Sequence, residues 1–324
     1  QIEAECVVSP EKLRALVAEA KKAGRFGLHV QGDVEQAPSS TSLVGIGFSI
    51  DGARGYYVPL AHRTLDAPKQ IPMDIARELL GPLLADSRVK KSCHRTRSDE
   101  LLLKRHGFSL AGVAFDASLA SYLLDPESPP ELPAVIVREF EAPFQTFDTL
   151  TKKPRQKPIP FGEVGVGEAA THAGAAAAFV LRLWDRLAPR IADEGMTEVL
   201  DELELPLASV LSEMEGLGVL VDIPKLKAQG KQIEKELVRL EKQAHEIAGK
   251  DFNVGSPRQL ETLLFDELKL KPIKRTKTAR STDAATLEAL AEQHPLPAVI
   301  LEHRQLAKLK STYIDTLPTL VNKD

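Results

Sequence analysis

The hydrophobic pattern of this chain changes near residue 195, and the two parts predict different architectures. Before that point, short apolar runs typical of strands occupy residues 26–30, 42–50 and 56–60. Amphipathic helices are expected at 9–20, 73–84, 98–106, 118–124 and 168–192. Strands followed by helices on both faces favour an α/β sandwich.

After residue 195, helical periodicity dominates and no convincing pair of strands is found. Lys225 to Gly249 is predicted to be a long, highly charged helix, because its apolar residues form one stripe and glycine is a typical helix C-cap. Further helices are predicted to begin at Ser256, at Thr282 and near Pro297. We therefore expect one domain at 1–192 and a helical region at 193–324.

The composition is that of an ordinary globular protein, with 324 residues of which 43% are hydrophobic and 27% charged. A formal net charge of -4 predicts no overall attraction to nucleic acid, so any such contact has to come from a local basic patch. The two cysteines, Cys6 and Cys93, form no disulfide framework and suit a reducing cytoplasm. No apolar run approaches the length of a membrane span. A chain that starts at Gln1 and stops at Asp324 is expected to be cut at both ends.

Several blocks in the second half resemble the thumb of bacterial family A DNA polymerases, the DNA polymerase I family. They occur in the family's order, at 212–216, 244–249, 252–253, 256–260 and 306–313. The last of these reads LAKLKSTY. In the first half, similarity to the adjoining 3′→5′ exonuclease domain of the same family lies at 43–45, 57–62 and 115–124. The resemblance covers nearly the whole chain.

This resemblance implies an RNase H-like (DnaQ-type) exonuclease fold with a mixed sheet, followed by an all-α thumb. It also implies a 5′ nuclease before Gln1 and a palm and fingers after Asp324. This chain alone is therefore expected not to polymerise and to hold no cofactor, whereas the parent DNA-directed DNA polymerase of replication and repair would use Mg²⁺. The implied partners are duplex primer–template DNA and the missing palm and fingers of the same polypeptide. The implied location is the bacterial cytoplasm, at the nucleoid, with no membrane.

The family's exonuclease domain uses two divalent metals, which activate water and stabilise the leaving oxygen. Hard cations such as Mg²⁺ prefer oxygen ligands, and the resemblance assigns them to four carboxylates with one nearby tyrosine. In this sequence the matching positions hold His29, Gln31, Asp99, His172 and Ala176. Only one carboxylate of the four is present. We therefore expect no metal and no exonuclease catalysis at this site.

The sequence leaves open two alternative sets of metal ligands. Asp33 and Glu35 have the spacing of the family's first carboxylate pair, although they are expected on the loop that follows the strand. His29, His172 and Asp99 could together hold a transition metal.

Two other polar positions have simpler interpretations. Cys93-His94 lacks a second pair at zinc spacing. Asp116 lies between a strand and a helix, which is typical of an N-cap rather than of a catalytic acid.

The second half offers three groups of candidate phosphate contacts. One is a basic loop between Leu268 and Thr282, and another is the start of the helix at Ser256. On the last helix, an apolar face is expected toward the protein, opposite an exposed cationic ridge; the apolar residues are Leu306, Leu309, Tyr313 and Leu317. The resulting DNA-binding candidates are Asn253, Ser256, Arg258, Lys274, Arg275, Lys277, Arg280, Arg304 and Lys308.

Three functions compete at this stage. The first is a DNA-binding part of a family A polymerase with an inactive exonuclease domain. The second is an active metal-dependent 3′→5′ exonuclease with unusual ligands. The third is a scaffold domain without chemistry of its own. The sequence opposes the second, because no acid lies between Glu168 and Asp185 on the closing helix.

Overall fold

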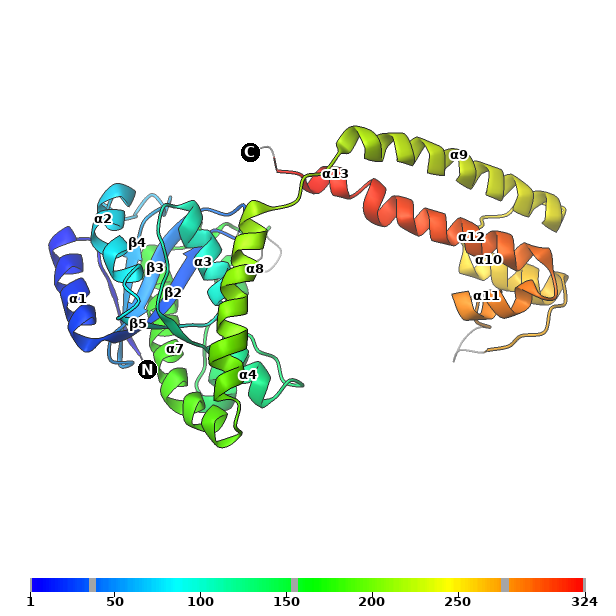
Figure 1. Cartoon of the computed structure of the whole chain (residues 1–324). Helices are drawn as coiled ribbons and strands as arrows, with labels where there is room; N and C mark the ends of the chain where they lie inside the picture. Colours follow the sequence, from blue (N-terminus) through cyan, green and yellow to red (C-terminus); the bar gives the residue numbers. More distant parts are fainter. Residues whose placement is uncertain (1, 35–38, 153–156, 275–279, 323–324) are drawn as a thin grey trace. The chain divides into compact units, whose positions relative to one another are not determined.

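The computed structural model of the chain describes residues 2–34, 39–152, 157–274 and 280–322. Contacts between Cα atoms divide the chain into two compact units, Gln1–Gly218 and Val219–Asp324. The first unit contains a sheet flanked by helices, and the second is built from helices (Figure 1). This arrangement confirms the predicted α/β fold followed by an all-α segment.

Within the described residues, the first unit has a six-stranded mixed sheet with the order β1-β4-β3-β2-β5-β6. The strands are β1 Glu3–Cys6, β2 Arg25–Gly32, β3 Leu43–Ser49, β4 Arg54–Pro59, β5 Lys90–Cys93 and β6 Val113–Asp116. Strand β3 pairs antiparallel with both β2 and β4. The outer pairs β1–β4, β2–β5 and β5–β6 are parallel. The sheet therefore combines antiparallel neighbours, β2–β3–β4, with parallel ones, which confirms the predicted mixed sheet.

Three helices supply the core on one side of the sheet: α1 Pro10–Ala23, α2 Met73–Leu84 and α3 Thr96–Arg105. Helix α1 begins where the sequence predicts, because the Ser9 side chain accepts a hydrogen bond from Lys12 N at 3.1 Å and Pro10 occupies the first turn. Apolar residues of these helices pack in one cluster with alternate residues of β2, namely Phe26, Leu28 and Val30. The period of two in β2 thus leaves its other residues facing away from this core.

The other face is covered by α7, Val166–Asp193, which lies against the strands (Figure 1). The approach is very close, because glycines of the sheet face small residues of the helix. A Cβ on Gly27 would lie 2.1 Å from Ala177 O, and one on Gly47 would lie 2.3 Å from Ala173 O. Neither position tolerates a side chain, so the alanine-rich sequence of α7 is explained by packing.

The rest of the first unit joins these layers. Between α4 Ala117–Leu124 and α7, the described chain forms α5 Leu132–Phe140, α6 Phe147–Thr151 and a 3₁₀ turn, η1 Phe161–Glu163. The chain then forms a π-helical turn, η2 Val199–Glu204, and α8 Leu205–Leu217.

Helix α8 packs on α3, where Ser209 Oγ donates to Glu100 at 2.9 Å and Arg97 pairs with Glu215 at 3.0 Å. For this reason the contact division falls after Gly218, further along the chain than the predicted domain boundary at 192.

The second unit is organised around the long helix α9, Ile223–Ala248, whose C-cap Gly249 has the left-handed φ of 71°. The remaining elements are α10 Pro257–Glu261, the π-helical turn η3 Thr262–Glu267, α11 Ala284–Ala291, α12 Pro295–Leu309, the π-helical turn η4 Lys310–Ile314 and α13 Leu317–Leu320. Helices α9, α11 and α12 share one apolar core that includes Leu240, Leu287 and Ile300. A long, charged helix is therefore fixed along one apolar stripe only.

Candidate functional site

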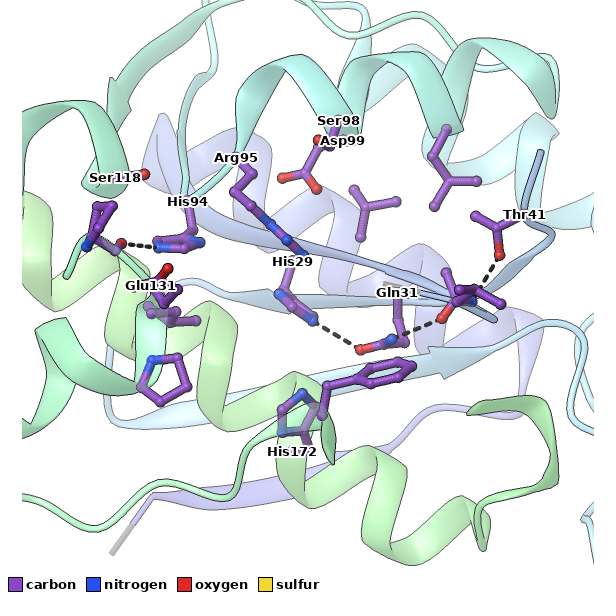
Figure 2. Close-up of a pocket in the computed structure, with 18 of the residues that line it drawn as sticks. His29, Gln31, Thr41, His94, Arg95, Ser98, Asp99, Ser118, Glu131 and His172 are labelled. Atoms are coloured by element: carbon purple, nitrogen blue, oxygen red, sulfur yellow. Dashed lines mark hydrogen bonds between the residues drawn. The ribbon is translucent and has the colours of Figure 1, made fainter. Parts of the chain in front are cut away.

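The first unit contains a cavity of about 250 Å³ beside β2, α3 and α7 (Figure 2). Its lining includes His29 and Gln31 from β2, Asp99 from α3 and His172 from α7. The tertiary structure thus brings together four of the five positions that the resemblance assigns to the metal site. The fifth, Ala176, is not among the lining residues.

Strand geometry explains why His29 and Gln31 point into this cavity. Gly27, His29 and Gln31 alternate with the core residues of β2, so they share the face that α7 covers. The rings of His29 and His172 meet edge to face, with their centroids 5.7 Å apart.

His29 and Gln31 form a neutral, directional pair, marked by dashed lines in Figure 2. Gln31 Nε2 donates to the carbonyl oxygen of Gly32 at 2.9 Å, which fixes the orientation of the amide. Gln31 Oε1 then faces His29 Nε2 at 3.1 Å. Because an amide oxygen only accepts, His29 must donate from Nε2 and carry its proton there. The amide nitrogen and oxygen of Gln31 are both engaged inside the protein.

The histidines around the cavity are held neutral. Burial lowers the pKa of His29 to about 3, and the nearby His172 adds to this effect. Burial likewise lowers the pKa of His172 and of His94 to about 4. His172 donates from Nδ1 to Gln145 O at 3.0 Å, and His94 from Nε2 to Pro130 O at 2.9 Å. At neutral pH the cavity therefore presents imidazoles without charge.

Asp99 keeps the family's carboxylate position but not an ordinary acidity. Burial raises its pKa to about 8, the positive charge of Arg95 lowers it by less, and Asp116 raises it further. The carboxyl group is therefore largely protonated at pH 7. Asp99 adds little negative charge to the cavity.

Ala176 belongs to the hydrophobic core. It has no exposed surface and packs in a cluster that contains Phe115, Val135 and Val180. The methyl group fills space between α7 and its neighbours rather than facing the cavity.

These residues do not fit a pair of Mg²⁺ ions. Such ions need oxygen ligands with negative charge, whereas positions 29, 31, 99, 172 and 176 hold two neutral imidazoles, an engaged amide, a protonated carboxyl and a methyl group. In the part of the chain that the structure describes, no three His, Cys, Asp or Glu side chains are grouped so that they could hold a metal. This finding also removes support from a transition-metal site at His29, His172 and Asp99.

Asp33 has a structural role. Its Oδ2 accepts from Arg63 at 2.8 Å and its Oδ1 from Gly162 N at 2.7 Å, so it ties two loops together. It does not line the cavity, and Glu35 lies outside the described residues.

The two other polar positions are also accounted for. Cys93 is buried in β5 with a raised pKa, caused chiefly by burial. Asp116 caps α4 as predicted, because its Oδ1 accepts from Ser118 N and Leu119 N. Its Oδ2 also accepts from Thr96 N and Oγ1, both at 2.7 Å.

Sequence reasoning missed His94 and Arg95 as cavity residues. They follow β5, whose residues Lys90–Cys93 show no apolar run that would predict a strand. The sequence therefore contains no signal that would place them beside β2.

In the second unit, the predicted site at the start of α10 has two roles. Asn253 Oδ1 accepts from Gly255 N at 2.8 Å, and Ser256 Oγ accepts from Gln259 N at 3.4 Å, so both side chains stabilise the local turn. Arg258 is exposed, and within the described residues its side chain makes no hydrogen bond or ion pair. Of these three residues, Arg258 is the one available to a phosphate.

The basic loop is partly neutralised. Arg280 donates from Nε to Glu261 at 2.9 Å and forms two bonds of 2.6 and 2.7 Å to Asp266. Lys274 pairs with Asp283 at 3.1 Å. Arg275 and Lys277 lie outside the described residues.

The expected ridge on α12 is divided in the same way. Arg304 is half-buried and donates to the carbonyl and hydroxyl oxygens of Thr282. Lys308 is exposed and makes no ion pair within the described residues. The structure thus places Arg304 in an internal contact and leaves Lys308 open to solvent.

The expectation that Leu309, Tyr313 and Leu317 face the protein is wrong, because they are 42%, 51% and 36% exposed. The π-helical turn η4, Lys310–Ile314, advances the chain by more residues per turn than an α-helix, which shifts the face of Tyr313 but does not account for Leu309, since Leu309 precedes the turn. Ile314 is the buried residue instead.

Comparisons with known proteins identify both parts of the chain. Residues 46–143 match the family described as DNA polymerase I, ribonuclease H-like domain. Residues 223–324 match DNA polymerase family A. DNA polymerase I of Synechocystis is 35% identical over 99% of this chain, and that of Bacillus subtilis is 33% identical over 86%. The chain belongs to DNA polymerase family A.

A solved structure supports the same assignment for both units. The POL domain of Pol1 from M. smegmatis, in complex with DNA primer-template and dNTP, matches 98% of this chain with a TM-score of 0.80 and 28% identity. This chain covers 51% of that chain and about a third of the curated relatives, at 33% and 30% of the two named above. Gln1–Gly218 is called the exonuclease-like unit below, and Val219–Asp324 is called the thumb unit after the expectation from the sequence. None of the described helices is long and apolar enough to cross a membrane.

Proposed function

We propose that this chain is the exonuclease-like and thumb part of a DNA polymerase of replication and repair, in which the thumb unit grips primer–template DNA. We further propose that the exonuclease-like unit performs no metal-dependent hydrolysis. The observation that carries this second statement is the hydrogen-bonded pair of His29 and Gln31, which occupies two carboxylate positions with neutral groups. The polymerase as a whole would act with Mg²⁺ in the bacterial cytoplasm, at the nucleoid.

The electrostatics of the cavity support the loss of hydrolysis. Two-metal catalysis needs anionic ligands to offset the charge of the ions. Here the one retained carboxyl, Asp99, is largely protonated at pH 7, and the imidazoles are neutral. Metals would have to enter a cavity in which Asp99 carries little charge and Glu131 is the one other carboxylate among the described lining residues.

We therefore expect no release of nucleotides from single- or double-stranded DNA in Mg²⁺ or Mn²⁺. The measurement is gel analysis of an end-labelled strand, with a mock preparation as the control for contaminating nucleases. Degradation that is metal-dependent, absent from the mock sample and abolished in Asp99→Ala would contradict the proposal.

Two side chains support DNA binding by the thumb unit. Arg258 and Lys308 are exposed cations without ion pairs among the described residues, so no protein contact has to be broken when they meet a phosphate. The solved relative named above contains a DNA primer-template. Arg280 and Arg304 have internal partners instead and are proposed to shape the surface.

We expect Arg258→Ala/Lys308→Ala to weaken binding of duplex DNA without regard to sequence, because phosphate contacts carry no base information. Wild-type affinity should lie in the range of roughly 10⁻⁴ to 10⁻⁶ M at physiological salt. Each lost contact should reduce the slope of log K against log salt by about 0.9. Fluorescence anisotropy across a salt series measures both quantities.

The matched control is Arg14→Ala/Lys21→Ala, which removes two exposed positive charges from α1. If the control and the thumb variant have the same slope, Arg258 and Lys308 make no specific contribution. Arg280→Ala should mainly lower stability, since it leaves Glu261 and Asp266 without their partner.

An exposed apolar stripe supports a further partner, the remaining polymerase domains of the same polypeptide. Leu207, Val210 and Met214 of α8 recur at spacings of three and four residues and are 42%, 52% and 60% exposed. A continuous apolar stripe of this kind is typical of an interaction surface. We propose that it is covered by domains that the longer relatives possess.

A further inference from the structure

Four arginines of the exonuclease-like unit lie near one another, apart from the residues that line the cavity, and three of them pair with one carboxylate. Arg182, Arg186 and Arg190 follow one another at intervals of four residues on α7, so they share a face of the helix at steps of about 6 Å. Arg138 comes from α5 and the carboxylate is that of Glu139. We call these five residues the arginine cluster. Its formal charge is +3, from four cations and one anion.

Glu139 holds two arginines of the cluster in place through ion pairs. Its side chain is only 7% exposed and accepts from Arg186 Nε at 3.0 Å and from Arg190 NH1 at 2.9 Å. Burial alone would raise the pKa of Glu139, but the hydrogen bonds from these two arginines lower it below its ordinary value. The carboxylate is therefore ionised and holds two guanidinium groups at fixed positions, while among the described residues their remaining N–H groups make no hydrogen bond.

Arg182 is held without any hydrogen bond. Its guanidinium carbon lies 4.7 Å from the ring centroid of Phe140 and 5.4 Å from that of Phe179. The side chain is exposed and, among the described residues, forms no ion pair. All five N–H donors of a positioned guanidinium are thus open to a ligand.

The chemistry of this surface selects phosphates. A guanidinium is a rigid fork that binds phosphate oxygens through two parallel hydrogen bonds. Three such groups along about 12 Å of helix exceed the size of one phosphate and match an extended polyanion. The chain as a whole has a net charge of -4, so this local excess of positive charge stands out from the rest of its surface.

We infer that the arginine cluster is a second DNA-binding surface, which contacts the phosphate backbone independently of the thumb unit. Binding there would position DNA against the exonuclease-like unit without any metal. This surface is separate from the cavity lined by His29 and Asp99, since none of the four arginines of the arginine cluster lines that cavity.

The test uses Arg182→Gln, because removing Arg182 breaks no described hydrogen bond or ion pair, whereas removing Arg186 or Arg190 would unpair buried Glu139. We expect about a tenfold loss of affinity for a labelled duplex in low salt, and a salt slope lower by about 0.9. Arg182→Lys keeps the charge and should retain most of the slope. The control Arg14→Gln removes one exposed cation from α1 and should bind as wild type.

Competitors separate the possible ligands at matched ionic strength. Unlabelled DNA should displace the probe, whereas inorganic phosphate should act no more strongly than chloride, and poly-glutamate should be weak. Selective displacement by inorganic phosphate would show a small-anion site, and strong displacement by poly-glutamate would show an acidic protein as partner. Either result, or equal affinity of Arg182→Gln and Arg14→Gln, would overturn the inference.

The outcome is independent of the proposed thumb contacts. Arg182→Gln should reduce affinity by the same factor in the Arg258→Ala/Lys308→Ala background, since phosphate contacts that share no partner contribute separately. If Arg258→Ala/Lys308→Ala keeps the wild-type salt slope while Arg182→Gln loses affinity, DNA binding by the thumb unit is rejected and DNA binding by the arginine cluster is retained.

Discussion

Ala176→Asp should lower the free energy of unfolding of the exonuclease-like unit by about 3–5 kcal/mol at pH 7. Ala176 has no exposed surface and packs with Phe115 and Val135, so an aspartate there has no solvent and no described cation to offset its charge. Chemical denaturation followed by circular dichroism measures the change. The loss should be smaller at pH 4, where the new carboxyl group is protonated.

The neighbouring substitution Ala175→Asp is the matched control. Ala175 is partly exposed on the same helix, so the new carboxylate can remain hydrated and should cost less than about 1 kcal/mol. Equal losses from the two variants would mean that position 176 is not the buried core position described above.

Restoring all the family's groups tests whether the backbone of the site survives. We expect the variant with His29→Asp, Gln31→Glu, His172→Tyr and Ala176→Asp to be unstable alone and to regain stability in Mn²⁺. Three new carboxylates would then join Asp99 to make the family's four, and the metal would offset their repulsion. Calorimetry that detects no Mn²⁺ uptake by the folded variant would show that the backbone no longer supports the site, or that these positions are misaligned.

Asp99→Asn should stabilise the protein increasingly as pH rises. The folded-state pKa of Asp99 is raised to about 8, above the ordinary value of 3.8, so the folded state retains a proton that the unfolded state loses. The contribution of the protonated Asp99 carboxyl to the stability of the wild type is therefore fully present below about pH 4 and is lost progressively up to about pH 8. The gain from Asp99→Asn should grow from near zero at pH 4 to a few kcal/mol at pH 8.

Asp116→Asn provides the contrast, because Asp116 is also buried and has a pKa raised to about 6. Its carboxylate accepts hydrogen bonds from Thr96, Ser118 and Leu119. An amide nitrogen cannot accept, so at least one oxygen's bonds are lost and the variant should be less stable despite losing an unfavourable charge. Denaturation at pH 4, 6 and 8 compares the two variants, and stabilisation by both would contradict the assigned roles.

Elements stabilised by local interactions were predictable. The helix Met73–Leu84 has the expected bounds, Gly249 ends α9 with a left-handed φ of 71°, and Asp116 caps α4. These features depend on a few neighbouring residues and on periodicity. Strands β1 and β5 were missed, since each has four residues and neither has an apolar run. They exist because neighbouring strands pair with them.

The sequence by itself determined the family, the α/β and helical parts, and which residues occupy the metal positions. It determined that carboxylates are missing at 29, 31 and 176, because the identity of a side chain needs no structure. Only the tertiary structure decided the charge state of Asp99 and the pairing of Gln31 with His29. These properties depend on burial and on partners that the fold supplies.

Partners supplied by the fold also decide which cations are available to a ligand and which are engaged inside the protein. Arg280 meets Glu261 and Asp266, and Arg304 meets Thr282, through contacts between residues far apart in the sequence. Lys308 and Arg182 look no different from them in the sequence, yet both remain without ion pairs in the described structure. A sequence states how many charges a chain carries. Packing decides which of them can meet a ligand, because an ion pair forms only between groups that the fold brings within a few ångströms.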